Sequence, residues 1–458
     1  MGVSVAASIR GAADTIAAIA TAPGRGAIAL VRMSGPVAEE IAARTVTPWP
    51  PAPRVATLAT IRDPASDAIV DRALVTRFEN GRSFTGEAMV EISTHGGPVS
   101  SALVLAALIS AGARPAQPGE FTRRAVVNGK LTLAQGEAIG DVIDATSRMA
   151  HRLALDALDG GLVRRVLALR DALVDVEALI AYDIDFPEED DGPVAPERIL
   201  RSSREVVSML EALLATAPAG ELVRQGALVV LAGLPNAGKS SLFNALLGDA
   251  RALVTPIPGT TRDAIEAVID GPRWPLRIVD TAGLRESSDT IERLGIEVSE
   301  RYLARAQVVL ACGEHPADIA AVRQRIATMT RAPVVGVLTK QDIATASDDV
   351  SGELVPVSAE MGTGLGELLS RIEQVLDASV TAIVPDLPVV TRARHVAALE
   401  AAAAEMRAFV EGWEAGELPA PVVAVHLRGA VAALEELVGV VDTEDVLDRV
   451  FRSFCVGK

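Results

Sequence analysis

The chain of 458 residues has two cysteines, five histidines and only 3% aromatic residues, and each shortage excludes a class of protein. Cys312 and Cys455 cannot form a disulfide framework, an iron–sulfur cluster or a four-thiolate zinc site. The histidines lack the HExxH spacing of zinc hydrolases. With so few aromatic side chains, the hydrophobic cores must be built from Ala, Val and Leu.

Long hydrophobic runs are also lacking. No basic segment followed by an apolar one opens the chain, and the longest uncharged stretch, 92–113, contains Pro98, glycines and serines. These features predict a cytoplasmic protein without a membrane span.

Basic residues are the minority, since 43 lysines and arginines stand against 60 aspartates and glutamates, which gives a net charge of −17. The acidity is uneven: residues 1–124 carry a net charge of +2, whereas 125–222 carry −9. An acidic chain is a poor candidate for coating nucleic acid on its own, because phosphate binding needs a basic face.

Lysine is the scarcest charged residue. There are 39 arginines and four lysines, which are Lys130, Lys239, Lys340 and Lys458. One explanation is that lysine is kept where a compact ammonium is needed and a planar guanidinium does not fit. The alternative is that the four positions are due to chance. Each lysine is therefore a candidate site residue.

The apolar pattern separates three kinds of segment. Residues 15–32 predict a strand, a Pro-Gly turn and a second strand, whereas 133–182 and 391–415 have apolar residues at helical spacing. Between the helical blocks, strand and helix patterns alternate. We expect an N-terminal α/β domain at 1–124, a helical domain in two parts at 125–222 and 381–458, and an inserted α/β domain at 223–380.

A nucleotide-binding loop is the clearest motif. The apolar segment 227–232 predicts a strand, and it is followed by Gly233-x4-Gly238-Lys239-Ser240 and then by a helical segment. The glycines let backbone N–H groups surround phosphates at the start of the helix. We expect Lys239 to reach the β- and γ-phosphate oxygens and Ser240 to bind Mg²⁺.

Two further segments are predicted to complete the metal end of this site. Asp280-Thr281-Ala282-Gly283 follows a predicted strand, which places a carboxylate near the metal and a glycine N–H near the γ-phosphate. The loop PGTTRD at 258–263 is suited to closing over Mg²⁺ through Thr261.

Two strand ends are predicted to read a guanine base. In Thr339-Lys340-Gln341-Asp342, Asp342 can accept both donors of the guanine edge and Lys340 can lie along the base. The backbone of Ser358-Ala359 can meet the guanine carbonyl. The usual motif is NKxD, so Thr339 replaces an amide by a hydroxyl; this predicts a lower nucleotide affinity with the preference for guanine kept.

The catalytic residue is less evident. Leu284 stands where Ras-like GTPases place a glutamine that orients water, and leucine cannot polarise water. Asn236 could hold a monovalent cation near the phosphates, and Glu292 could act on water; each could equally face solvent.

Beyond the nucleotide motifs, the chain resembles the MnmE (TrmE) family of bacterial tRNA-modifying GTPases. The matching stretches span all three expected domains: DTIAAIATAPGRGAIALVRMSG (14–35), SFTGEAMVEISTHGGP (83–98), PGEFTRRAVVNGKLTLAQGEAIGDVIDA (118–145), IDFPEE (184–189), GLPNAGKSSLFNAL, PGTTRD, DTAGLRE and the terminal FCVGK (454–458).

The resemblance implies an N-terminal folate-binding domain that dimerises, a discontinuous helical domain and an inserted Ras-like P-loop domain. It implies K⁺-stimulated GTP hydrolysis, with Lys239, Thr261 and Glu292 in catalytic roles and Glu292 orienting the attacking water. The predicted GTP contacts are Asn236, Ala237, Gly238, Lys239, Ser240, Ser241, Thr255, Pro256, Ile257, Pro258, Gly259, Thr260, Thr261, Asp280, Thr281, Ala282, Gly283, Thr339, Lys340, Asp342, Ser358, Ala359 and Glu360.

Cofactors and partners also follow from the resemblance. Ser240 and Thr261 would bind Mg²⁺; K⁺ would be held by Asn236, Thr255, Ile257 and Thr260; and formyl-tetrahydrofolate, the one-carbon source, would contact Arg32, Glu91, Lys130 and Lys458. The implied assembly is a homodimer that forms a heterotetramer with the FAD-containing MnmG (GidA) protein. That complex adds aminomethyl or carboxymethylaminomethyl groups to carbon 5 of the wobble uridine of tRNA.

Two other readings are open. A regulatory GTPase of ribosome assembly would share the nucleotide motifs, but it would be expected to carry a basic RNA-binding domain, and none is visible in the sequence. A stand-alone folate-dependent transferase would leave the nucleotide motifs unexplained.

Overall fold

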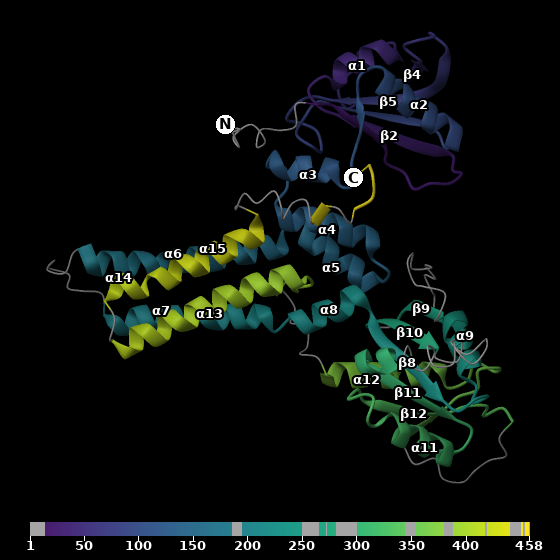
Figure 1. Cartoon of the computed structure of the whole chain (residues 1–458), viewed down its shortest axis with the longest axis vertical. Helices are drawn as coiled ribbons and strands as arrows, with labels where there is room; N and C mark the ends of the chain where they lie inside the picture. Colours follow the sequence, from purple (N-terminus) through teal and green to yellow (C-terminus); the bar gives the residue numbers. More distant parts are fainter. Residues whose placement is uncertain are drawn as a thin grey trace, which may run out of the picture. The chain divides into compact units, whose positions relative to one another are not determined.

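The computed structural model of the chain (Figure 1) describes residues 14–185, 195–249, 265–271, 273–280, 300–343, 353–379, 388–416, 419–439, 450–451 and 454–457. The chain divides into two compact units, Met1–Gly140 with Val438–Lys458, and Asp141–Leu437. Each unit has its own sheet and its own hydrophobic clusters.

The first unit is built on a seven-stranded sheet in the order β3-β4-β5-β6-β2-β1-β7. Neighbouring strands are antiparallel except β1 and β7, which are parallel. The strands are β1 (Ile16–Ile19), β2 (Ile28–Ser34), β3 (Val46–Thr47), β4 (Thr57–Arg62), β5 (Ile69–Phe78), β6 (Met89–His95) and β7 (Arg114–Pro115).

The two faces of this sheet differ, because successive side chains of a strand point to opposite sides. Val31 and Ile92 belong to a buried cluster that includes residues of α1 (Ala38–Thr45) and α2 (Pro98–Ser110). The opposite face, which we call the open face, carries the paired residues Arg32 and Glu91. The expected α/β fold of this segment is therefore confirmed.

The end of the chain belongs to the first unit. Val456 forms an isolated bridge with Pro118, and the N–H of Gly119 donates to the carbonyl of Cys455 over 3.2 Å. These contacts lie at the start of α3 (Glu120–Val127). Helix α4 (Leu133–Asp144) follows α3 in the sequence.

The second unit contains the helical part of the chain. Long helices lie side by side in Figure 1, and both α6 and α7 bury apolar side chains, as Leu169 and Leu173 of α6 and Leu210 of α7 show. The ion pair between Arg170 and Glu435 joins α6 to α15 over 3.0 Å. The helices are α5 (Arg148–Leu158), α6 (Gly161–Asp185), α7 (Pro196–Leu214), α8 (Ala217–Gln225), α13 (Ala393–Ala415), α14 (Ala420–Val423) and α15 (Val425–Val438).

Among the described residues, one helical stretch, Pro196–Gln225, is long and apolar enough to cross a membrane by length and composition. It comprises α7 and α8, and its apolar residues Leu210, Leu213 and Val223 are buried inside the protein. Burial of this kind is typical of a core helix.

The second unit also holds a six-stranded sheet in the order β13-β12-β11-β8-β10-β9. All neighbours are parallel except β9, which is antiparallel to β10. The elements are β8 (Ala227–Gly233), α9 (Lys239–Asp249), β9 (Ile265–Asp270), β10 (Pro275–Asp280), β11 (Val308–Gly313), α11 (Pro316–Ile326), β12 (Val334–Leu338), β13 (Leu354–Pro356) and α12 (Leu365–Ser379).

Alternate residues of β8 enter two different clusters. Val229 and Leu231 pack with residues of α9 and α12, whereas Leu228 and Val230 pack with residues of α11. Both faces of the sheet are therefore buried, which is why the strand is an unbroken apolar run. In a parallel sheet of this kind, ligands bind at the carboxyl ends of the strands.

Candidate functional site

The loop that joins β8 to α9 has the backbone of a phosphate-binding loop. Asn236 and Gly238 have φ angles of 63° and 77°. This left-handed region suits glycine and, among other residues, asparagine. At Gly233, an added Cβ would lie 2.6 Å from the carbonyl oxygen of Cys312, so only glycine lets β8 and β11 approach this closely.

Lys239 lies inside this loop. Its Nζ donates to the carbonyls of Gly233 over 3.1 Å and Leu234 over 2.9 Å. The residue is only 6% exposed. The ammonium is therefore held where the helix begins and the loop N–H groups gather, as expected for a group that meets phosphate oxygens.

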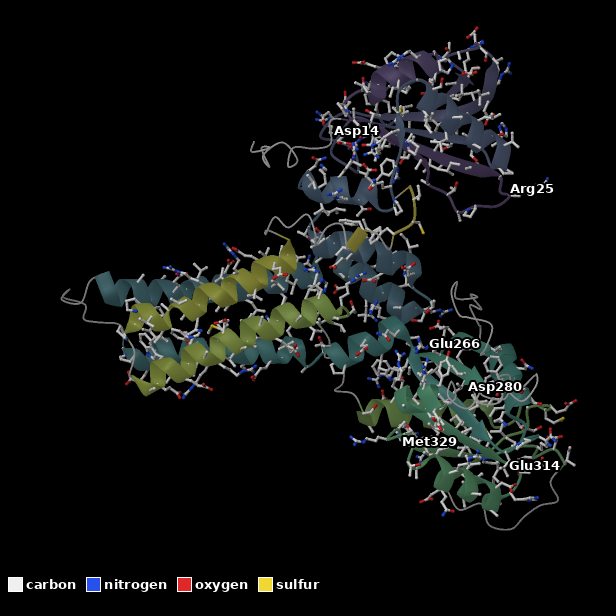
Figure 2. The ribbon with its side chains drawn as sticks, viewed as in Figure 1. Asp14, Arg25, Glu266, Asp280, Glu314 and Met329 are labelled. Atoms are coloured by element: carbon white, nitrogen blue, oxygen red, sulfur yellow. The ribbon has the colours of Figure 1, made fainter. Side chains whose placement is uncertain are left out.

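Ser240 and Asp280 meet at the same end of the sheet. The hydroxyl of Ser240 donates to Oδ2 of Asp280 over 2.6 Å, and Asp280 is fully buried at the end of β10. A hydroxyl and a carboxylate held together supply the hard oxygen ligands that Mg²⁺ prefers. The residues present thus fit a magnesium site, and Figure 2 labels Asp280 at this position.

Thr339 connects the base-reading strand to the phosphate loop. Its Oγ1 lies 2.9 Å from the carbonyl oxygen of Ala237 and 3.2 Å from that of Gly313, and the residue is buried. A threonine hydroxyl has one hydrogen, so it can donate to only one of these carbonyls at a time, although the Gly313 carbonyl also accepts the backbone N–H of Thr339 over 2.9 Å. This is the structural consequence of threonine in place of asparagine.

The Thr339→Asn variant is expected to bind GTP about three- to tenfold more tightly. An asparagine amide has two N–H groups, which allows it to donate to both carbonyls at once, and one added hydrogen bond contributes about 1 kcal/mol. Fluorescent GTP titration of wild type and variant measures the change. Unchanged or weaker binding by the variant would contradict this explanation.

Asp342 is held by its neighbour across the site. The hydroxyl of Ser358 donates to Asp342 Oδ1 over 2.7 Å, and the N–H of Met361 donates to the Ser358 hydroxyl over 3.1 Å. Within the described part of the chain, Oδ2 of Asp342 has no hydrogen bond. The carboxylate is thus oriented with an oxygen left for a ligand.

Glu314 is a site residue that the sequence did not indicate. Its Oε1 lies 2.5 Å from Nζ of Lys340, and Lys340 has a φ of 55°. The ion pair therefore joins Lys340, which follows β12, to Glu314, which follows β11. No motif predicts it, because the two residues come from different strand ends.

A hollow of about 180 Å³ lies among these groups. It is lined by residues of α9 and by both predicted base-reading motifs, namely Gly238, Ser241, Leu242, Thr339, Lys340, Asp342, Ile343, Val357, Ala359 and Glu360. The structure therefore brings together the predicted phosphate, metal and guanine contacts that it describes.

Several predicted residues lie outside the described residues. For GTP, Mg²⁺, K⁺ and catalysis these are Thr255, Pro256, Ile257, Pro258, Gly259, Thr260, Thr261, Thr281, Ala282, Gly283 and Glu292, and for folate Lys458. Their roles stay predictions.

Burial makes Cys312 unreactive. The thiol is completely buried in β11, and this burial raises its pKa to about 12. A thiol with such a pKa has almost no thiolate at neutral pH.

The predicted folate residues lie in the first unit. Nε of Arg32 donates to Oε1 of Glu91 over 2.9 Å, and the guanidinium stands 5.4 Å from the ring centre of Phe84 and 5.7 Å from that of Phe121. Lys130 is exposed and its Nζ donates to the carbonyl of Gly81 over 3.0 Å. The structure pairs the first two residues and shows no direct contact between them and Lys130 within the described part.

The first unit also contains a partly buried ionic network that the sequence did not reveal. Arg124 is 5% exposed and contacts Asp14 over 2.8 Å, Glu120 over 3.0 Å and Glu87 over 3.2 Å. Arg114 bonds to both Asp14 and Glu120. Figure 2 labels Asp14 in this region.

Arginine contacts set the protonation of this network. Burial raises the pKa of Glu120, but hydrogen bonds from Arg114, from the Gln117 backbone and from Arg124 outweigh it and hold the pKa below its usual range. Burial also raises the pKa of Asp14, but hydrogen bonds from Arg114 and Arg124 outweigh it and lower the pKa. Both carboxyls are therefore ionised in the folded protein at neutral pH.

Comparison with known proteins agrees with this geometry. A family model described as the MnmE helical domain matches residues 133–455, and one described as the GTP-binding protein TrmE N-terminus matches residues 15–130. The tRNA modification GTPase MnmE of Heliobacterium modesticaldum is 41% identical over 97% of this chain and 99% of its own. A protein of the same name from Thermus thermophilus is 43% identical over 98% of this chain and 100% of its own.

Among solved structures, the G domain of the T. maritima FeoB iron transporter is 28% identical. It covers 33% of this chain and 99% of its own, with a TM-score of 0.27.

Proposed function

Because the chain belongs to the MnmE family of tRNA modification GTPases, we propose that it hydrolyses GTP to drive modification of the wobble uridine of tRNA. The observation that carries the GTPase part is the arrangement around Thr339 and Asp342. It joins a phosphate-binding loop to a hollow suited to guanine, at one edge of one sheet.

The described residues divide the chemistry among them. Lys239 places its positive charge beside the β- and γ-phosphates, while loop N–H groups bind their oxygens. Ser240 and Asp280 would hold Mg²⁺, which when bound neutralises charge that develops on the transferred phosphoryl group. Asp342 accepts hydrogen bonds from the guanine edge and so selects the nucleotide.

We propose that K⁺ supplies the positive charge that other GTPases take from an arginine. Asn236 is exposed in the phosphate loop, and among the described residues its side chain has no hydrogen-bond partner. Its amide oxygen is thus available to the cation, with Thr255, Ile257 and Thr260 as the further proposed ligands. Glu292 would orient water, since Leu284 cannot.

We further propose that the open face of the first unit binds formyl-tetrahydrofolate through Arg32, Glu91, Lys130 and Lys458. The guanidinium of Arg32, flanked by two aromatic rings, suits a ligand with carboxylates and a planar ring system. The same face exposes Leu58 and Leu74, which supports contact with a second copy of the chain in a homodimer.

The redox step is assigned to a partner. The chain has no GxGxxG dinucleotide fingerprint, so we propose that the FAD-containing MnmG protein completes a heterotetramer that acts on tRNA in the cytoplasm. Aminomethyl or carboxymethylaminomethyl groups on the wobble uridine are the proposed products.

Exchange of K⁺ for Na⁺ tests the proposed mechanism. GTP hydrolysis by wild type is expected to be at least about tenfold faster in K⁺, because K⁺ replaces an arginine that elsewhere contributes about 10³–10⁵-fold. Asn236→Ala should lose most of this difference while still binding GTP. Equal wild-type rates in the two salts would refute the cation mechanism.

A further inference from the structure

A second hollow lies in the nucleotide-binding sheet domain, between α11 and α12. Its volume is about 530 Å³. It borders Val334 and Val335, the first residues of β12, whereas Thr339 follows the other end of that strand. Five residues of strand span about 15 Å, so this hollow is distinct from the guanine site.

The charge of this hollow is positive. Arg323, Arg331 and Arg371 line it, and Glu353 is the one acidic residue of its lining. The three arginines come from α11, from the segment that follows α11 and from α12. In a chain with a net charge of −17, such a local excess of guanidinium groups identifies a place for an anion.

These guanidinium groups are weakly used within the protein. The contact of Arg323 with Glu353 is 4.0 Å, its bond to the carbonyl of Val334 is 3.5 Å, and its buried Nε has no partner among the described residues. Arg371 donates to Gln374 over 3.3 Å. Long contacts of this kind leave most of the donors available to a ligand with several acceptor oxygens.

The floor of the hollow is apolar. The edge strand β13 pairs only with Gly336–Leu338, so Val334 and Val335 have no strand beside them on that side within the described residues. Val375 of α12 adds to this floor. Guanidinium groups above a small apolar floor suit alternating phosphate and ribose groups.

We propose that this hollow binds the sugar–phosphate backbone of tRNA. The lining contains no aromatic ring on which a base could stack, and its arginines are spread over three segments, which favours a polynucleotide backbone over a free nucleotide. The proposal rests on tRNA being the substrate of the proposed function. It places a direct tRNA contact on this chain.

Binding of fluorescently labelled tRNA to the full-length chain tests the site. The Arg331→Ala/Arg371→Ala variant is expected to bind tRNA about tenfold more weakly than wild type. In a plot of log affinity against log salt concentration, the slope for the variant should be smaller in magnitude by about one to two. The control Arg301→Ala/Arg305→Ala removes the same charge from exposed positions outside the hollow and should change the affinity less than about twofold. GTP hydrolysis should be equal in all three proteins.

Each other outcome overturns the site. Equal tRNA affinity of wild type and the hollow variant, or an equal loss in the control, would show that the arginines do not contact tRNA specifically. The site is also refuted if wild type binds poly-glutamate and the hollow variant loses this binding but still binds tRNA. The ligand would then be an acidic protein segment. A further measurement separates the tRNA-binding proposal from the proposed function. Wobble-uridine modification is measured in cells whose only copy of the protein is wild type or the hollow variant. If cells with wild type lack the modification, the proposed function itself is wrong.

Discussion

Asp342→Asn is expected to lower the affinity for GTP by about 10²–10⁴-fold. The carboxylate can accept two hydrogen bonds from the guanine edge, and an asparagine amide can accept on one side only while it presents a donor on the other. A donor that a bound base covers and that faces a guanine donor is left unpaired, and sites built around substrate hydrogen bonds reject unmatched partners by such factors.

The same change should create a new preference. Xanthine carries a carbonyl oxygen where guanine carries its amino group, so it presents an acceptor to the new amide donor. Xanthosine triphosphate is therefore expected to bind the variant better than GTP, and to bind wild type poorly. Competition titrations with both nucleotides measure the exchange.

The control for this prediction is Glu367→Gln, which removes a carboxylate from an exposed position of α12 outside the hollow. It should bind both nucleotides as wild type does. If Asp342→Asn retained its preference for GTP, the base would be read by other groups and the assignment of Asp342 would be wrong.

The parts of this site that the sequence predicts are those encoded locally. A strand, a glycine loop and a helix follow one another within Ala227–Asp249, so Gly238, Lys239 and Ser240 are identifiable from spacing alone. The order of the later motifs fixes their place, because parallel strands bring their carboxyl ends to one edge.

The contacts that the sequence does not predict join residues that are distant in the chain. Glu314 and Lys340 are 26 residues apart, and the carbonyls that Thr339 reaches belong to the phosphate loop and to β11. Spacing does not encode such pairs; they depend on which strands become neighbours. A resemblance to a family points to the motif residues and not to these supporting contacts.

Charge burial was the other feature that the sequence could not indicate. Arginine and glutamate are ordinarily exposed, so nothing in the PGEFTRRA segment shows that Arg124 and Glu120 are buried. Their partner Asp14 is more than a hundred residues away in the chain. Only the fold shows that the segment beside the proposed folate residues is held by ion pairs.

Arg124→Ala is accordingly expected to destabilise the first unit by about 3–5 kcal/mol at pH 7. Removing one partner of a buried ionic network leaves uncompensated buried charge, which costs this much in other proteins. Here Glu120 and Glu87 would each lose a cationic partner. Hydrogen exchange of the amides of β1, β2 and β6 measures the loss within this unit of the full chain.

The pH dependence of this loss provides a second test. The pKa of Glu120 is lowered in the folded state, so its contribution to stability is present above its unfolded value of about 4.5 and is lost as the pH falls toward the folded value. Without Arg124, Glu120 loses one of the hydrogen bonds that hold its pKa down but keeps those from Arg114 and the Gln117 backbone. The difference in stability between wild type and variant should therefore be constant from pH 7 to about 4.5 and should shrink as the pH falls further, toward the folded pKa of Glu120.

Arg62→Ala is the matched control, since it breaks an exposed contact with Asp67 in the same sheet. Exposed ion pairs contribute less than about 1 kcal/mol, so this variant should exchange nearly as wild type does at every pH. If both variants lost the same stability, or if the loss in Arg124→Ala were independent of pH, the network would not be what holds α3 beside the open face. Comparable losses would then have to come from packing of the arginine stems rather than from charge.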